Sequence, residues 1–82
     1  MNTLTNKALA VGIYIGPVSI KLFLDDGRTL EIDYRHFPLL AEGNLEKRRN
    51  VEIYADGMLI HWPDLDEDIA VEHLLKGKFP VK

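Results

Sequence analysis

An Asp-Gly pair occurs twice in this chain, at Asp26-Gly27 and at Asp56-Gly57, each time between two short runs rich in apolar residues. Asp-Gly tolerates the positive φ angles that a tight hairpin loop requires. Around the first pair, residues 18–24 and 29–34 alternate between apolar and polar side chains, which is typical of strands with one buried face. The chain is therefore expected to contain two antiparallel hairpins.

Further strands are expected before the first hairpin and around the second Asp-Gly pair. Residues 8–15 form an apolar run with β-branched residues, in which Gly12 is a candidate β-bulge. Gly16-Pro17 ends this run as a turn. The second hairpin is expected to pair residues 51–54 with residues 58–62. The apolar face of the first hairpin is expected to contain Val18, Ile20, Leu22, Leu24, Leu30, Ile32 and Tyr34.

Two short helices are expected between the hairpins. Proline is tolerated in the first turn of a helix and glycine often follows the last turn, so Pro38 and Gly43 indicate a helix within residues 35–42. Asn44 can cap a second helix over residues 45–49, because its side chain can accept a hydrogen bond from an unpaired N–H of the first turn.

A third helix is expected over residues 69–76. The acidic segment 64–68 would then lie at its N-terminus, where the helix dipole favours negative charge. The elements predict an α+β fold: one small antiparallel sheet of about five strands with two or three short helices against one face. The length of 82 residues fits a single domain, with a core over about 8–77 and flexible termini at 1–7 and 78–82.

The composition excludes several kinds of site and partner. The chain has no cysteine, so disulfides and thiolate metal sites are excluded. Its apolar runs fall short of the ~20 residues of a membrane span, and residues 1–7 do not resemble a signal peptide, so a cytoplasmic location is expected. The net charge of −3 makes the chain a poor match for nucleic acid. Small domains often gain stability by oligomerising, and a homodimer is therefore a further expectation.

The densest group of polar side chains lies within residues 60–69, which also contain the only tryptophan. Neighbouring strand residues face opposite sides, so Trp62 is expected in the core and His61 at the surface. The acidic residues could solvate a helix start, dock a basic partner, or bind a hard cation. The candidate residues for partner binding are His61, Asp64, Asp66, Glu67 and Asp68.

A metal or catalytic site is the alternative use of this segment. The spacing of Asp64, Asp66 and Asp68 matches the start of a calcium loop, but Ile69 and Leu75 stand where that loop needs glycine and glutamate. His61 with Asp64 and Asp66 could support acid–base chemistry. No serine, cysteine or lysine lies nearby as a nucleophile, and the chain has no glycine-rich phosphate loop. No catalytic residue and no cofactor is therefore expected.

Two other clusters have simple structural interpretations. The basic run Lys47-Arg48-Arg49 is flanked by glutamates and has no interleaved aromatic residues, so a solvated helix face is expected rather than a phosphate-binding site. Phe37, Tyr54 and Trp62 could form an aromatic patch for a partner. In so small a domain they are expected to belong to the core.

Several short motifs occur in a characteristic order: Asp26-Gly27-Arg28, Phe37-Pro38, Glu46-Lys47-Arg48, and the long run from Trp62 to Gly77. In this combination the chain resembles a small bacterial family, domain of unknown function 2442, over about residues 18–77. The family often has serine where Ala70 stands here, and that hydroxyl could cap the final helix.

The resemblance implies a protein-binding role at most, since the family has no established biochemical activity and supplies no catalytic residues to carry over. Many members resemble the antitoxin halves of toxin–antitoxin pairs and are encoded beside a small protein of another family, domain of unknown function 4160. The resemblance thus implies an interaction protein whose acidic segment meets a small, basic, toxin-like partner. Two alternatives stay open: a metal-binding or catalytic domain using His61, Asp64 and Asp66, and a self-assembling domain whose sheet edges pair two copies.

Overall fold

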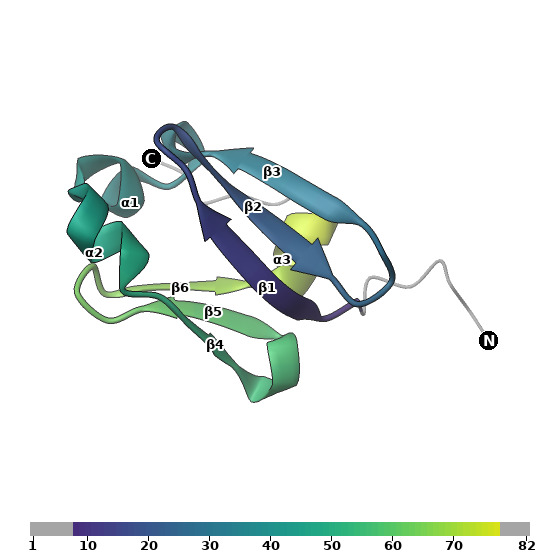
Figure 1. Ribbon diagram of the computed structural model, residues 1–82. Coiled ribbons are helices and arrows are strands. Elements are labelled where there is room, and N and C mark those ends of the chain that lie inside the picture. Colours follow the sequence, from purple (N-terminus) through teal and green to yellow (C-terminus); the bar gives the residue numbers. More distant parts are fainter. Residues whose placement is uncertain (1–7, 78–82) are drawn as a thin grey trace.

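The computed structural model describes residues 8–77, and the two termini expected to be flexible, 1–7 and 78–82, lie outside the described residues. Within residues 8–77 the fold is α+β, as predicted. It contains two antiparallel sheets of three strands each in this part of the chain, instead of one sheet of about five strands. Figure 1 shows the two sheets stacked on each other.

The first sheet consists of three strands in chain order: β1 (Ala10–Ile15), β2 (Ser19–Leu24) and β3 (Thr29–Asp33). The register between β1 and β2 shifts between Ala10 and Gly12, so the β-bulge predicted at the glycine is confirmed. Gly27 has a φ of 92° in the turn between β2 and β3, the left-handed conformation that the Asp-Gly pair predicted.

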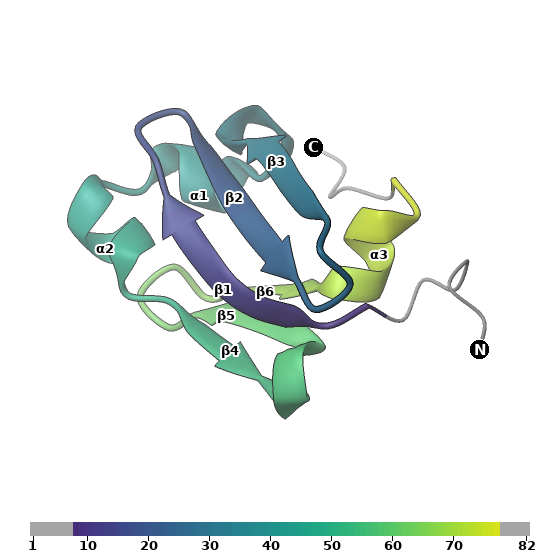
Figure 2. The same cartoon turned by 45° about the vertical axis from the view of Figure 1, so that its right-hand side comes forward.

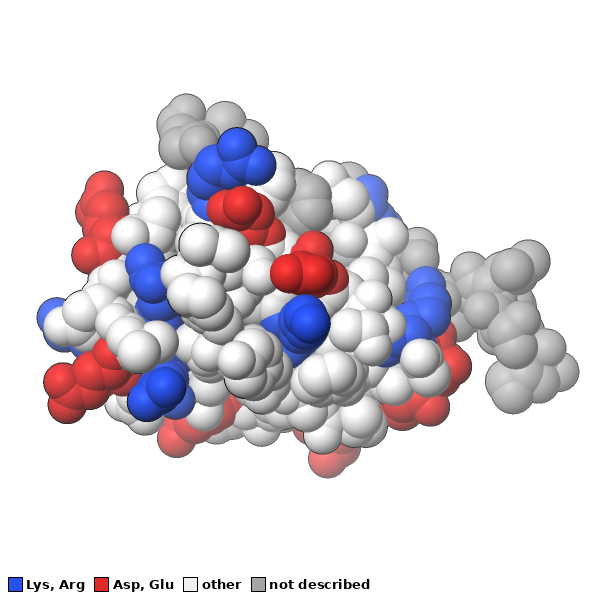
Figure 3. Space-filling model, turned by 45° about the horizontal axis from the view of Figure 1, so that its top comes forward, with Lys and Arg blue, Asp and Glu red and all other residues white. Residues whose placement is uncertain are grey.

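The inward face of the first sheet follows the predicted alternation. The side chains of Ile20, Leu22 and Leu24 are buried, as are those of Ile32 and Tyr34. The prediction was wrong for Val18, whose side chain is 64% exposed because it lies in the turn before β2. The outer face of the first sheet points to solvent (Figure 3) and contains Val11, Gly12, Tyr14, Lys21, Phe23, Thr29 and Glu31.

The connection between the sheets contains a 3₁₀ turn (Tyr34–His36) followed by α1 (Pro38–Glu42) and α2 (Leu45–Arg49). The single helix predicted over 35–42 is therefore divided in two, with the proline at the start of α1. The Asn44 cap is confirmed: its side-chain oxygen accepts a hydrogen bond from the backbone N–H of Lys47 at 2.8 Å.

Arg48 does not belong to the solvated helix face predicted for residues 47–49. Its Nε and Nη2 atoms donate hydrogen bonds to the backbone oxygens of Leu40 and Ala41, at 2.8 and 3.0 Å. Its guanidinium lies 4.3 Å from the centre of the Tyr34 ring. The carbonyl groups of the last turn of a helix lack partners within that helix, and Arg48 satisfies two such groups of α1.

The second sheet consists of β4 (Glu52–Tyr54), β5 (Leu59–Trp62) and β6 (Glu67–Ala70), and α3 (Val71–Leu75) follows it. A 3₁₀ turn at Ala55–Gly57 joins β4 to β5. The order β4-β5-β6 makes β5 the central strand. Figure 2 shows β1 passing over this sheet, with α2 and α3 toward opposite ends of the molecule.

The helix predicted over 69–76 is confirmed only from Val71 onward, and the prediction that the acids lie at its N-terminus was wrong. The chain reverses in a turn after Trp62, with Asp66 at a φ of 52°, and residues 67–70 then pair antiparallel with β5. Helix α3 begins only at Val71. Strand pairing places Ile69 beside Ile60, and both are buried. This burial favours a strand where the local pattern favoured a helix.

The core lies between the two sheets, and its largest fully buried side chains are Trp62, Phe37, Ile20, Leu22, Leu40, Ile60 and Val71. Phe37 and Trp62 are core residues, as predicted. Tyr54 is 48% exposed instead, because its neighbour Ile53 takes the inward position on β4. None of the helices within residues 8–77 is both long and apolar enough to cross a membrane.

Candidate functional site

The outer face of the second sheet gathers aromatic, apolar and acidic side chains in two rows. Residues directly opposite each other in an antiparallel sheet point to the same side. The register aligns Glu52 with His61 and His61 with Asp68, and it aligns Tyr54 with Leu59 and Leu59 with Ala70. Trp62, next to His61, points into the core. The outer face of the second sheet therefore consists of Glu52, Tyr54, Leu59, His61, Asp68 and Ala70.

Four of these side chains contact one another. The Tyr54 and His61 rings are stacked, with their centres 5.4 Å apart and an interplanar angle of 18°. His61 Nδ1 forms a short contact with Asp68 Oδ1. The Tyr54 hydroxyl donates a hydrogen bond to Glu52 Oε1 at 2.6 Å. This hydrogen bond and the negative charge of Glu52 raise the pKa of Tyr54 above its usual value of 10.0.

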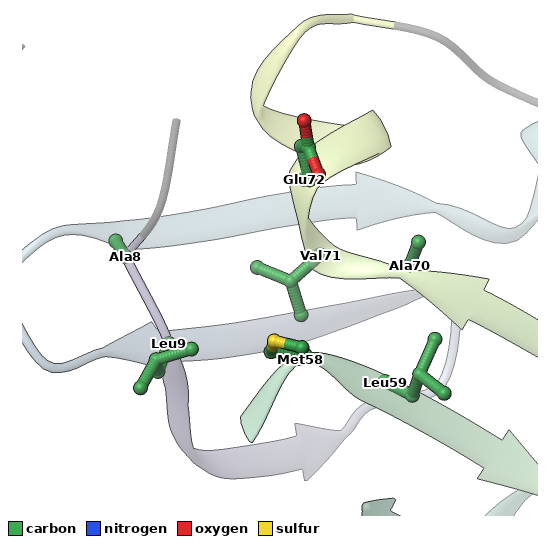
Figure 4. A pocket seen from close by; sticks show the side chains of 7 residues that line it. All are labelled: Ala8, Leu9, Met58, Leu59, Ala70, Val71 and Glu72. Atoms are coloured by element: carbon green, nitrogen blue, oxygen red, sulfur yellow. The ribbon is translucent and has the colours of Figure 1, made fainter. Parts of the chain in front are cut away.

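An apolar pocket adjoins this face at the start of β5 (Figure 4). It has a volume of about 600 Å³ and is lined by Ala8, Leu9, Met58, Leu59, Ala70, Val71 and Glu72. Leu59 and Ala70 belong both to the pocket and to the outer face of the second sheet, so the two are continuous. Met58 at the pocket is 54% exposed. Apolar surface therefore lies directly beside the acidic row.

The structure brings only two of the five predicted binding residues together. His61 and Asp68 lie side by side on the outer face. Glu67 is opposite Trp62 in the register, on the inward side of the sheet, and is half-buried. Asp64 lies in the turn, where its carboxylate accepts a hydrogen bond from Asn50 Nδ2 at 2.9 Å. Asp66 occupies the same turn and is exposed.

The metal-binding alternative has no geometric support in the described residues. Within 8–77 no group of three or more His, Asp and Glu side chains lies where it could hold a metal ion. His61 is on a strand and pairs with Asp68, whereas Asp64 and Asp66 belong to the turn after Trp62. The three residues are therefore not gathered as ligands for a metal ion.

Sequence reasoning missed Glu52 and Leu59 and assigned Tyr54 to the core, although all three belong to the same face as His61. A signal was present, because residues two apart in a strand share a face. Glu52 and Tyr54 have this spacing, and so do Leu59 and His61. Which side of β4 lies beside which side of β5 depends on the register between them, and the hairpin turn sets that register.

The inward position of the Glu67 side chain can be tested through its ionisation. Burial raises the pKa of its carboxyl above the usual 4.5. The folded state thus favours the protonated form, so the contribution of Glu67 to stability is greatest at low pH and is lost as the pH rises through the raised pKa. Glu67→Gln removes the charge. We expect it to raise the free energy of unfolding at pH 7 by less than about 1 kcal/mol, since the side chain is only partly buried.

Urea denaturation of both proteins at two pH values measures this effect. At about pH 3.5 the carboxyl is largely protonated, so the two proteins should be equally stable. An equal difference at both pH values would assign the effect to packing instead of charge.

Comparison with known proteins places the chain among proteins whose function is unknown. The model of a family described as "Protein of unknown function (DUF2442)" matches residues 11–80. No curated protein matches the sequence. A crystal structure of a protein of unknown function from Rhodospirillum rubrum ATCC 11170 has a TM-score of 0.82 and 24% identity, over 93% of this chain and 94% of that one.

A solution NMR structure of an uncharacterized protein from Chromobacterium violaceum is also similar. Its TM-score is 0.76 and its identity 20%, over 89% of this chain and 69% of that one. At these identities the two structures establish that the fold is shared.

Proposed function

This chain belongs to the DUF2442 family of proteins of unknown function, and we propose that it is a small cytoplasmic interaction protein that binds a basic partner protein. The binding surface is the outer face of the second sheet together with the adjoining pocket. One observation supports this proposal above others. Among the described residues of that face, exposed apolar and aromatic side chains stand beside carboxylates, and neither lysine nor arginine is present.

The apolar part of the face has the composition of a protein interface. Tyrosine and methionine are enriched at the centre of such interfaces, and Tyr54 and Met58 are 48% and 54% exposed here. The adjoining pocket could receive an apolar side chain of the partner, because small apolar cavities beside a polar rim are typical anchor sites.

The charged part of the face selects a basic partner. A carboxylate has about four acceptor positions. Asp68 uses one of them for His61, and Glu52 uses one for Tyr54. These contacts hold the carboxylates in place and leave acceptor positions for lysine or arginine. Complementary charge of this kind speeds association and excludes acidic partners.

The resemblance to antitoxins suggests which protein this partner is. We propose that it is the product of a short, basic, toxin-like gene beside the gene for this chain. The net charge of −3 agrees with such a partner, and the acids at 64–68 contribute through Asp68 on the face and through Asp64 and Asp66 in the turn.

Co-expression of the tagged chain with the neighbouring basic protein tests the proposal. We expect co-purification, and we expect Glu52→Lys with Asp68→Lys to weaken the complex at least about tenfold, because like charges would then meet. The matched control is Glu42→Lys with Glu46→Lys, which makes the same change in net charge on the exposed sides of α1 and α2. A tagged chain that never retains the neighbour would contradict the proposed partner, and equal losses in both double variants would contradict the proposed face.

A further inference from the structure

The outer face of the first sheet is a second exposed surface, separate from the proposed binding face. Its aromatic and aliphatic side chains are open to solvent: Val11 is 64% exposed, Tyr14 56% and Phe23 39%. Figure 3 looks onto this side of the molecule and shows single charges of both signs with uncharged surface between them. The two outer faces lie on opposite sides of the stacked sheets (Figure 1).

The charges on this face are arranged in one row across the sheet. The register places Tyr14 opposite Lys21 and Lys21 opposite Glu31. Lys21 is therefore at the centre of the face and Glu31 is on the neighbouring strand. Glu31 accepts a hydrogen bond from the hydroxyl of Ser19 at 2.8 Å, whereas no ion pair of Lys21 is found within residues 8–77.

We propose that this face pairs with the same face of a second copy of the chain. A two-fold axis that runs between β2 and β3, parallel to the strands, would place Lys21 of each copy opposite Glu31 of the other. An isologous interface needs this kind of self-complementarity, because the two-fold axis makes every contact occur twice. Two sheets packed face to face also keep their strands nearly aligned, as this axis requires.

One aromatic residue of the face, Phe23, fits the same arrangement. A Cβ atom built on Gly12 would lie 3.5 Å from the Phe23 ring, so Phe23 lies beside the bare backbone of the glycine. The surface of the face is consequently recessed at Gly12 and raised at the rings of Tyr14 and Phe23. Face-to-face packing about this axis overlaps β2 and β3 of the two copies and would remove apolar surface of Phe23 from water while the Lys21–Glu31 pairs set the register, whereas Tyr14 on β1 lies beside the overlap.

The small area of the face determines how tight this dimer is. The axis overlaps only β2 and β3 of each copy, and two strands of about five residues cover roughly 10 by 17 Å, from strand spacings of about 4.8 Å and rises of about 3.3 Å. Stable interfaces bury about 800 Å² on each partner, so we expect a weak dimer that forms only at roughly hundreds of micromolar. The pairing uses the sheet face, in contrast to the edge pairing considered from the sequence.

Charge reversal and charge exchange test this arrangement by sedimentation velocity from about 5 µM to about 1 mM, a range chosen for an interface at the small end of the size scale. We expect wild type to dimerise within this range. Lys21→Glu alone and Glu31→Lys alone should each weaken the dimer at least about tenfold, because like charges then meet twice. The exchanged variant, with both substitutions, should restore association to within about threefold of wild type.

Two controls make the result specific to this face. The exchange of Glu46→Lys with Lys47→Glu on α2 should leave dimerisation unchanged, and so should Glu52→Lys with Asp68→Lys on the outer face of the second sheet. Phe23→Ser should weaken the dimer without any change in charge, because Phe23 lies on β2 within the overlap. Wild type that remains monomeric at about 1 mM would overturn the proposal. It would also be overturned if the single charge reversals had no effect, or if the exchanged variant did not restore the dimer. Far-UV circular dichroism confirms that each variant is folded.

Discussion

Gly57→Ala is expected to lower the free energy of unfolding by about 3–5 kcal/mol, from backbone strain together with overpacking. Gly57 has a φ of 104°, which alanine adopts only with strain. A Cβ atom there would also lie 2.6 Å from the backbone oxygen and 2.9 Å from the nitrogen of Ala10. These are backbone atoms at the start of β1, so the clash cannot be relieved by turning a side chain.

Gly27→Ala is the matched control, because Gly27 lies in the other Asp-Gly turn at a φ of 92°, but a Cβ atom there would point into open space, with no contact within 4 Å. It should cost only the strain, about 1–2 kcal/mol. Thermal unfolding measures the difference: a domain of this size loses about 4–8 °C for each kcal/mol. Equal shifts for the two variants would contradict this prediction, because they would show that the clash with the backbone of Ala10 adds no cost at Gly57.

Trp62→Ala is expected to destabilise the fold by a similar amount, about 3–5 kcal/mol, because a large buried ring leaves a cavity. The Trp62 side chain is fully buried. Its indole Nε1 donates a hydrogen bond to the backbone oxygen of Arg48 at 2.9 Å. Trp62→Phe should cost less, about 1–3 kcal/mol, since it keeps a ring in the core but leaves that oxygen without its donor.

Tyr54→Ala is the control for this series, because it removes an aromatic ring from the outer face of the same sheet. We expect a loss below about 1 kcal/mol, since the site can rehydrate. Urea denaturation followed by far-UV circular dichroism compares the three variants without relying on tryptophan fluorescence. A loss for Tyr54→Ala as large as that for Trp62→Ala would contradict the assignment of the two sides of the second sheet.

Features set by short stretches of chain could be predicted well from the sequence. The turn at Gly27 follows from the freedom of glycine at positive φ. The cap at Asn44 follows from sequence spacing, because the N–H that a cap side chain binds lies two or three residues later. The burial of Trp62 and the exposure of His61 follow from strand alternation. In each case the residues that decide the structure lie within a few positions of one another.

Features that depend on distant pairing could not be predicted in the same way. Ile69 begins a run with helical spacing, yet it lies in β6 because β5 is available to pair with it. The chain reverses at Asp66, a residue type that adopts left-handed backbone more readily than most. The same pairing brings Asp68 to His61 and turns Glu67 inward. The acidic segment therefore divides between two faces and a turn, a division that its composition does not reveal.

The indole hydrogen of Trp62 is a natural reporter of opening in this protein. It is the only indole in the chain, and its bond to Arg48 joins β5 to α2. Exchange with deuterium requires this bond to break and water to reach a fully buried side chain. The exchange rate of this one NMR signal thus follows the detachment of α2 from β5, and it measures the stability of that contact without labels or denaturant.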